Sequence, residues 1–166
     1  MNTHVRGAVP HDAASISAIV QAGFVKCVAP DWEPCAQHDF LRDTSADQLA
    51  GRIAEATIVE VYEEEGQVLG VISMPRANLV QLFFVAPGHL NRGIGRTLWE
   101  SARRQIEERY PEVKTVELNA SPYSVPAYQA LGFFPISKPF RRRGAVATRM
   151  ACWLPGKGLD VAKHAT

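Results

Sequence analysis

The sequence predicts a single domain of mixed α/β class, in which helices flank a β-sheet. Apolar residues change between helical and strand periodicity along nearly the whole chain, and there is no internal repeat or linker. The chain has 166 residues, of which 46% are hydrophobic, enough for one sizeable core. We expect the domain to span residues 1–154 and a loose tail, rich in Gly, Lys and small residues, to span residues 155–166.

The N-terminal part predicts a short strand and a first helix. Residues 5–9 form the strand, and Asp12 is placed to cap the helix. Residues 28–44 contain two prolines and several carboxylates, so we expect an irregular segment. The apolar stripe of the first helix consists of Ile16, Ile19, Val20 and Phe24.

A second helix and a hairpin complete the first half. Thr44 or Ser45 caps the helix, whose apolar side carries Leu49 and Ile53. The hairpin consists of residues 57–62 and residues 67–74, because each stretch reads as a strand and a Glu-Glu-Gly turn lies between them.

The second half begins with an apolar run, residues 79–85, that predicts a central strand. Residues 93–109 form a helix, because Ile94, Leu98, Ala102 and Ile106 recur every four residues. After this helix we expect a strand over residues 115–119, a helix over residues 125–131, and a last hairpin of residues 133–140 and 146–154.

The net charge, the cysteines and the apolar runs indicate which partners and which cellular compartment to expect. The net charge of +1 gives no global field that would favour nucleic acid or a membrane surface. The three cysteines are widely spaced and form neither a disulfide framework nor a Cys-x-x-Cys metal site, which favours a reducing compartment. There is no apolar signal core and no apolar run near 18 residues, so we expect a cytoplasmic location.

The junction between the central strand and its helix, residues 85–98, is the most informative stretch. A proline and a short polar turn follow the strand, and the helix starts at Gly93-Ile94-Gly95. A helix N-terminus offers unpaired N–H groups and partial positive charge, so it suits a phosphate or pyrophosphate. Arg92 and Arg96 add full positive charge at the same place.

Two common phosphate motifs are excluded. No Gly-x-x-x-x-Gly-Lys-Ser/Thr run exists, so this is no nucleotide P-loop. A dinucleotide fingerprint would need a third glycine where Leu98 stands, and it would follow the first strand rather than lie past mid-chain. A single pyrophosphate cradle remains.

Two motifs resemble those of the GNAT superfamily of N-acetyltransferases. Leu90-Asn91-Arg92-Gly93-Ile94-Gly95 is similar to its acyl-CoA-binding motif, with Leu90 in place of the usual Gln or Arg. About 30 residues later, the segment from Ser124 to Phe133 resembles the helix ending in Tyr-x-x-x-Gly-Phe that closes the CoA site. The predicted order of elements also matches that of the family, over nearly the whole chain.

This resemblance implies a fold and an activity. The fold would be a central, mostly antiparallel mixed sheet of about six or seven strands, flanked by about four helices and splayed at the acyl-CoA site. The activity would be direct transfer of an acetyl group from acetyl-CoA to a primary amine of a small molecule or peptide, in a ternary complex and without a metal. The CoA-binding residues would be Phe83, Phe84, Val85, Asn91, Arg92, Gly93, Ile94, Gly95, Arg96 and Ser121.

The chemistry sets two further requirements. A lysine-like amine has a pKa near 10.4, so at pH 7 only about one molecule in 2,500 is neutral and able to attack. The oxyanion that forms is best met by fixed N–H groups. The resemblance places these donors around Phe84 and Val85, where the strand splays.

The resemblance names candidate catalytic residues, each with a plainer alternative. Tyr128 would give a proton or a hydrogen bond to the leaving sulfur, or it is simply a core aromatic residue. Glu117 would be the general base, or it is a strand-end glutamate that faces water. Ser121, or Asn119 in its place, would contact CoA, or both belong to the turn before Pro122.

The acceptor side is less well defined. The family's acceptor pocket is lined by the region that here holds Asp31, Glu33, His38 and Asp39, whose acidic groups would suit a cationic amine; the alternative is a solvated loop. Residues 141–143, three arginines, would touch the 3′-phosphate of CoA or an acidic partner, or they form a solvated hairpin tip.

Three functions stay open. The first is the N-acetyltransferase. The second is a non-catalytic acyl-CoA sensor that kept the cradle and lost the chemistry. The third is an enzyme that acetylates charged tRNA, which only the arginine cluster supports. We expect an amine substrate, no nucleic acid or membrane partner, and either a monomer or a homodimer.

Overall fold

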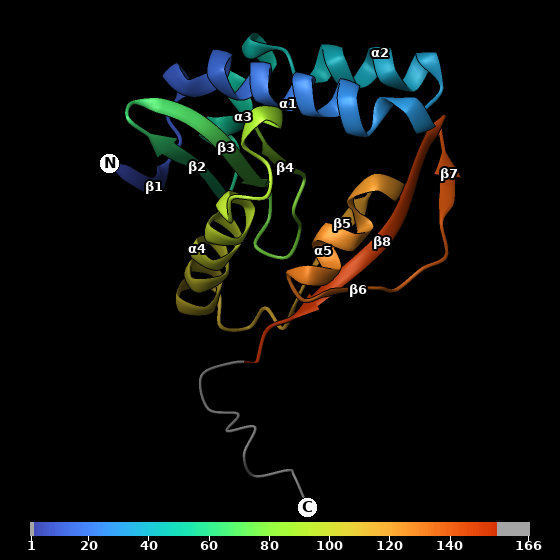
Figure 1. Cartoon of the computed structure of the whole chain (residues 1–166). Helices are drawn as coiled ribbons and strands as arrows, with labels where there is room; N and C mark the ends of the chain where they lie inside the picture. The colour runs from blue at the N-terminus through green and yellow to red at the C-terminus, as the bar shows by residue number, and fades with distance from the viewer. Residues whose placement is uncertain (1, 156–166) are drawn as a thin grey trace, which may run out of the picture.

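The computed structural model describes residues 2–155 and confirms the predicted mixed α/β class. Within these residues there are five α-helices and two four-stranded antiparallel sheets. The tail predicted from residue 155 onward lies, apart from Pro155, outside the described residues. Figure 1 shows helices on both sides of the first sheet and the second sheet beside it.

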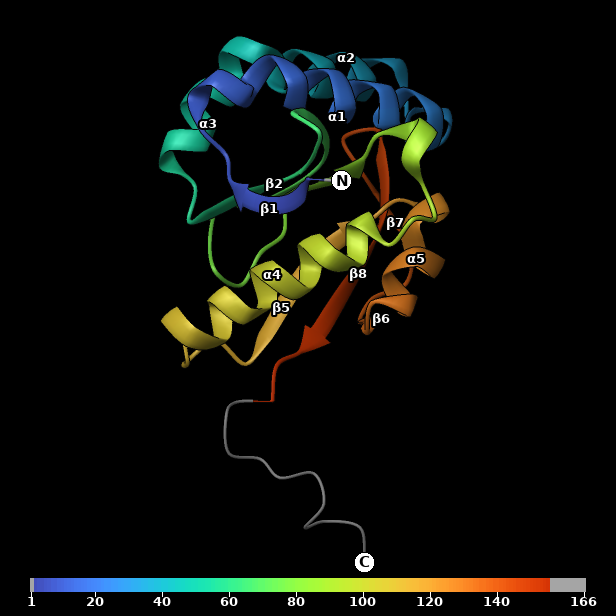
Figure 2. The same cartoon turned by 60° about the vertical axis from the view of Figure 1, so that its left-hand side comes forward.

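The first sheet has the strand order β1-β2-β3-β4 and is antiparallel throughout. Its strands are β1 (Thr3–Gly7), β2 (Ile58–Glu64), β3 (Gln67–Met74) and β4 (Leu82–Val85). The helices α1 (Ala13–Cys27), α2 (Pro34–Asp43) and α3 (Ala46–Glu55) form a layer over one face, and α4 (Ile94–Arg109) lies on the other (Figures 1 and 2).

Strand β3 is buried on both faces, which explains its composition. Its apolar residues run without alternation from Leu69 to Met74, as expected for a strand covered on both sides. Val71 packs with α1 and α3, whereas Ile72 packs with α4. These two clusters on opposite faces of the sheet hold the helices that frame the site.

The second sheet consists of β5 (Thr115–Ala120), β6 (Phe133–Pro135), β7 (Phe140–Arg142) and β8 (Ala145–Trp153). Strand β8 is long enough to pair with all three other strands. Helix α5 (Val125–Ala130) connects β5 to β6. The side chains of β5 alternate: Val116, Leu118 and Ala120 are buried in the core with α4, and the face with Glu117 and Asn119 points away from it.

The two sheets join at one point and then diverge. Leu79 and Glu117 form a parallel bridge, with hydrogen bonds from the Val80 N–H to the Glu117 carbonyl (3.0 Å) and from the Glu117 N–H to the Asn78 carbonyl (2.9 Å). Beyond this point β4 pairs only with β3, and β5 pairs only with β8, among the described strands. The edges of β4 and β5 that face each other are therefore splayed.

The segment expected to be irregular contains a helix, so that prediction was wrong. Pro34 occupies the first turn of α2, where its missing N–H and fixed φ are favourable. At this position the proline starts a helix and does not interrupt one. Ser45 does cap α3, since its side chain accepts a hydrogen bond from the Gln48 N–H.

Three strand boundaries also differ from the prediction. The central strand begins at Leu82 rather than at residue 79, because Leu79 bridges to Arg76 and Glu117 instead of pairing with β3. The first strand is residues 3–7 rather than 5–9. The last hairpin is not one pair: β6 and β7 are separate strands that pair with different ends of β8.

Candidate active site

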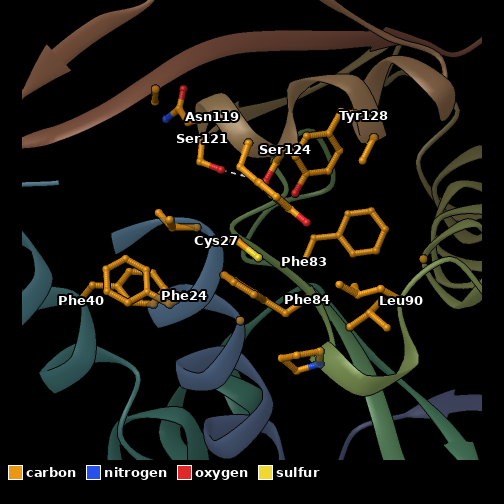
Figure 3. A pocket seen from close by; sticks show the side chains of 18 of the residues that line it. Phe24, Cys27, Phe40, Phe83, Phe84, Leu90, Asn119, Ser121, Ser124 and Tyr128 are labelled. Atoms are coloured by element: carbon orange, nitrogen blue, oxygen red, sulfur yellow. Dashed lines mark hydrogen bonds between the residues drawn. The ribbon is translucent and has the colours of Figure 1, made fainter. Parts of the chain in front are cut away.

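A pocket of about 350 Å³ lies at the splay between β4 and β5 (Figure 3). Helices α1 and α2, the start of α4, helix α5 and strand β8 contribute the rest of its wall. None of the described residues that line it is Asp, Glu, His, Lys or Arg. The lining residues are Gly23, Phe24, Cys27, Val28, Trp32, Phe40, Gln81, Phe83, Phe84, Val85, Pro87, Leu90, Gly95, Asn119, Ser121, Tyr123, Ser124, Ala127, Tyr128, Leu131, Val146 and Ala147.

The turn before α4 presents unpaired backbone donors. Asn91 (φ 60°) and Gly93 (φ 81°) have left-handed conformations, which turn successive N–H groups toward one side. The first intrahelical hydrogen bond runs from the Thr97 N–H to the Gly93 carbonyl. The N–H groups of residues 94–96 therefore have no partner in the described chain, as is usual for a helix start.

The space around this turn fits a phosphate group. A Cβ built at Gly93 would meet no atom within 4 Å, and one at Gly95 would come no closer than 3.8 Å to the Phe83 ring. The two glycines thus leave open space beside the turn that carries the unpaired N–H groups. Bare donors, a helix dipole and open space together are what an anion needs.

The two arginines of the turn are held by the protein itself. The Arg92 guanidinium pairs with the Glu64 carboxylate (2.9 Å) and contacts the His89 Nδ1 (2.6 Å). The Arg96 guanidinium donates to the Ala130 carbonyl (3.0 Å) and so links α4 to the end of α5. Both cations stand beside the turn with positions fixed by these contacts.

Strand β4 directs backbone donors into the splay. The Ala86 N–H donates to the Leu69 carbonyl of β3 at 2.8 Å. Because N–H groups alternate in direction along a strand, the N–H groups of Val85 and Phe83 point to the opposite edge. That edge has no partner strand among the described residues, so these donors face the pocket.

Tyr128 extends from α5 into the pocket. Its ring centroid lies 5.8 Å from that of Phe83 and 5.9 Å from that of Phe133. Figure 3 shows the hydroxyl directed into the pocket, and no described residue forms a hydrogen bond with it. Burial raises the pKa of the Tyr128 phenol, so the hydroxyl keeps its proton and can donate it in a hydrogen bond.

The polar residues of β5 and the following turn separate into two groups. Asn119 and Ser121 line the pocket, and the Ser121 and Ser124 hydroxyls are 2.8 Å apart. Glu117 does not line it, although it shares the strand face of Asn119 and lies about 7 Å further along β5.

The segment after α1 does reach the pocket, but through apolar rather than acidic side chains. Asp31, Glu33, His38 and Asp39 are all exposed and none lines the pocket. Trp32 and Phe40 line it instead. Residues 141–143 form the β7–β8 hairpin tip, where the Arg141 guanidinium lies 3.4 Å from the Glu33 carboxylate.

Several lining residues carried no functional signal in the sequence. Phe24 belongs to the apolar stripe of α1 and reads as a core residue. Gly23 and Cys27 belong to no motif. A Cβ at Gly23 would lie 2.7 Å from the Phe84 Cδ1, so this glycine is what lets the Phe84 ring pack against α1.

Residues 2–155 contain neither a helix suited to a membrane nor a cluster of side chains suited to a metal ion. None of the helices there has the length and apolar character needed to cross a membrane. No three His, Cys, Asp or Glu side chains in this range are grouped so that they could hold a metal ion.

Comparisons with known proteins agree on one family. Residues 28–154 match the family model described as an acetyltransferase (GNAT) domain. The peptidyl-lysine N-acetyltransferase YiaC of Escherichia coli (strain K12) is 27% identical over 93 residues, which cover 56% of this chain and 61% of that protein. The chain thus spans less than two thirds of the length of this curated relative.

Solved structures share the fold at low sequence identity. A GCN5-related N-acetyltransferase from Rhodopseudomonas palustris superimposes with a TM-score of 0.79 at 19% identity, covering 93% of this chain and 97% of the other. The PaiA N-acetyltransferase from Thermoplasma acidophilum, in complex with coenzyme A, gives 0.75 at 14% identity, covering 93% and 100%.

Proposed function

Because this chain belongs to the GNAT acetyltransferase family, we propose that it transfers an acetyl group from acetyl-CoA to a primary amine in a ternary complex. One observation carries the proposal. The outward N–H groups of β4 and the Tyr128 hydroxyl face one pocket, and the α4 turn with its unpaired N–H groups adjoins that pocket at Leu90 and Gly95. These are the groups needed to bind a pyrophosphate, polarise a carbonyl and assist a leaving sulfur.

The α4 turn and the pocket wall would bind acetyl-CoA. Residues 91–96 would hold the pyrophosphate through their N–H groups, with Arg92 and Arg96 as nearby cations. Ser121 and Asn119, which line the pocket, would donate to the polar groups of the pantetheine arm of a bound CoA. Acetyl-CoA supplies the acetyl group in activated form, as a thioester.

The chemical step needs donors at the carbonyl oxygen. The Val85 N–H, with that of Phe83 further along the edge, points into the splay and would stabilise the negative charge that develops on this oxygen. The amine nitrogen forms a bond to the acetyl carbon as the carbon–sulfur bond breaks. The nitrogen loses one proton in the step, and the departing sulfur gains one.

Tyr128 would interact with the leaving sulfur atom of CoA. A phenol with a raised pKa is a weak acid toward a thiolate, so full proton transfer from Tyr128 is unfavourable. Its hydroxyl is otherwise unpartnered among the described residues and faces the pocket, so it would act as a hydrogen-bond donor. The proton that the sulfur finally takes then comes from solvent.

The acceptor must reach the site as a neutral amine. The pocket wall contains no charged side chain among the described residues, so removal from water favours the neutral form. We assign Glu117 to receive the proton that the amine loses, because it shares the β5 face of the pocket residue Asn119. Glu117 does not line the pocket itself, so the proton would reach it through solvent.

Two measurements test the proposal together. Thiol release from acetyl-CoA is followed with a panel of small amines, amino acids and lysine peptides, and acetyl-CoA binding is measured by calorimetry. We expect micromolar binding and turnover with at least one amine, confirmed by a product heavier by one acetyl group. Binding without turnover on any amine would favour the acyl-CoA sensor, and no binding would refute the proposed cradle.

A further inference from the structure

One end of the pocket has an aromatic wall whose purpose the acetyl-CoA site does not explain. We call this the acceptor wall, and it consists of Phe24, Val28, Trp32, Phe40, Phe84 and Val146. It lies on the far side of β4 from α5 and Tyr128, as Figure 3 shows for Phe24, Phe40 and Phe84.

The rings of the acceptor wall are fixed against one another. Phe24 and Phe40 stack with centroids 4.1 Å apart, and Trp32 meets them edge-on at 5.2 and 5.9 Å. Gln37 donates to the backbone carbonyls of Ala29 and Trp32, both at 2.9 Å, which ties the loop before α2 in place. A wall that is already ordered binds an apolar group without the entropic cost of ordering its own side chains.

The wall has little to offer a polar or charged group. The Trp32 indole N–H is already used, because it donates to the Val146 carbonyl at 3.2 Å. No charged side chain among the described residues lines the pocket, and the carboxylates of Asp31, Glu33 and Asp39 are exposed outside it. A second ammonium group placed against the wall would lose its hydration without gaining a counter-ion.

The two segments that flank this end of the pocket are bonded to each other. The Glu33 N–H donates to the Gly144 carbonyl at 2.9 Å, and the Arg141–Glu33 pair lies beside this bond. With the Trp32–Val146 bond, these contacts join the segment before α2 to the β7–β8 hairpin. An extended peptide has no passage between the two, whereas a small molecule can sit against the rings.

Resting on the transfer reaction proposed above, we infer that the acceptor is a small primary amine whose amino group is carried on an aromatic or bulky apolar body. The rings of Trp32, Phe40 and Phe84, backed by the buried Phe24, would hold that body, and the amine would point along Phe84 toward the Val85 N–H. Polyamines and the lysine side chains of peptides would be poor acceptors, because each brings a charge or a polar chain to the wall.

The first arm of the test compares an acceptor that has an apolar body with two that do not. We expect kcat/KM for 2-phenylethylamine to exceed that for 1,4-diaminobutane and for a lysine-containing peptide by about tenfold or more, because burial of one ring gives at least that factor. Equal values, or a preference for the diamine or the peptide, would overturn the inference while leaving the transferase intact. Failure of acetyl-CoA itself to bind would instead count against the proposed function.

The second arm does not need turnover. Cys27 lines the pocket and is partly buried, whereas Cys35 is exposed, so alkylation of each can be followed by peptide mass spectrometry. We expect 2-phenylethylamine to slow alkylation of Cys27 at least about threefold without changing that of Cys35, and 1,4-diaminobutane to change neither. No protection of Cys27 by any aromatic amine would refute the assignment.

The third arm of the test introduces a carboxylate at two positions of α2. Phe40→Glu puts a carboxylate on the wall, and His38→Glu puts one on the exposed face of the same helix. We expect Phe40→Glu to reverse the preference toward 1,4-diaminobutane and His38→Glu to leave it unchanged. An unaltered preference in a folded Phe40→Glu protein would sink the inference; if this variant fails to fold, the two preceding arms decide.

Discussion

Replacing Gly23 with alanine tests whether the Phe84 ring is positioned by α1. The new Cβ would stand 2.7 Å from the Phe84 Cδ1, whereas ordinary contacts begin at 3.4 Å, so the ring must retreat by about 0.7 Å. Overpacking of this size costs about 1–3 kcal/mol. Alanine in place of glycine inside a helix stabilises the protein by about 1 kcal/mol. The free energy of unfolding should therefore fall by between zero and about 2 kcal/mol.

Gly51→Ala is the matched control for this prediction. Gly51 also lies inside a helix, α3, but it is exposed and its Cβ would meet no atom within 4 Å. This variant keeps the helical gain without the clash, so its Tm should rise by about 2–4 °C. The difference in stability between the two variants isolates the contact with Phe84.

The kinetic consequence separates a wall residue from a simple packing residue. A ring displaced into the pocket should raise KM for the amine acceptor, because a shift near 1 Å at a substrate surface can cost about tenfold or more. Calorimetric affinity for acetyl-CoA should change by less than about threefold. If Gly23→Ala gains as much Tm as Gly51→Ala and keeps its KM, Phe84 is not held against α1.

Three further predictions follow from the same structure. Gly93→Glu should lower acetyl-CoA affinity in calorimetry by about 100-fold or more, through strain at φ 81° and charge repulsion, whereas Gly66→Glu, with the same φ and equally open space, should not change it. Tyr128→Phe should lower kcat by about tenfold or more with unchanged acetyl-CoA affinity; equal losses of both would make Tyr128 structural. Burial raises the pKa of the Glu60 carboxyl above its unfolded value, against the hydrogen bonds from Ser101 and Gln105, so the wild type should lose stability as pH rises above about 4.3. Glu60→Gln should remove this slope in urea unfolding at pH 5 and pH 8, and an unchanged slope would mean that Glu60 is not its source.

The sequence predicted the elements that local patterns control. The apolar repeat of α4 and the cap at Ser45 depend on residues within a few positions of one another, and both were predicted correctly. Helix α2 was missed, because Pro34 acts as a starter or a breaker depending on whether it falls in the first turn. The split of the last hairpin was missed as well, because the length of β8 decides it rather than the turn.

The parts of the candidate site that depend on local sequence could also be predicted, and those that depend on distant residues could not. The α4 turn could be proposed from the sequence, because its chemistry lies in one contiguous stretch. The acceptor wall could not, because Phe24, Phe84 and Val146 come from distant parts of the chain and meet only in the fold. Nothing in the sequence near Gly23 indicates that its missing side chain makes room for a ring. The roles of Tyr128, Glu117 and Ser121 remain predictions.

The splay between β4 and β5 also bears on how the protein avoids self-association. A strand edge with free N–H and carbonyl groups is a template onto which another chain can add a strand. Here the open edge belongs to β4, an edge strand of only four residues, and it lines a pocket to which α1 and α5 also contribute. A strand from another chain could form only a few backbone hydrogen bonds with β4, and the helices beside the pocket would obstruct its approach. The backbone donors of this edge can therefore stay accessible to small ligands while the same edge offers a neighbouring chain little to pair with.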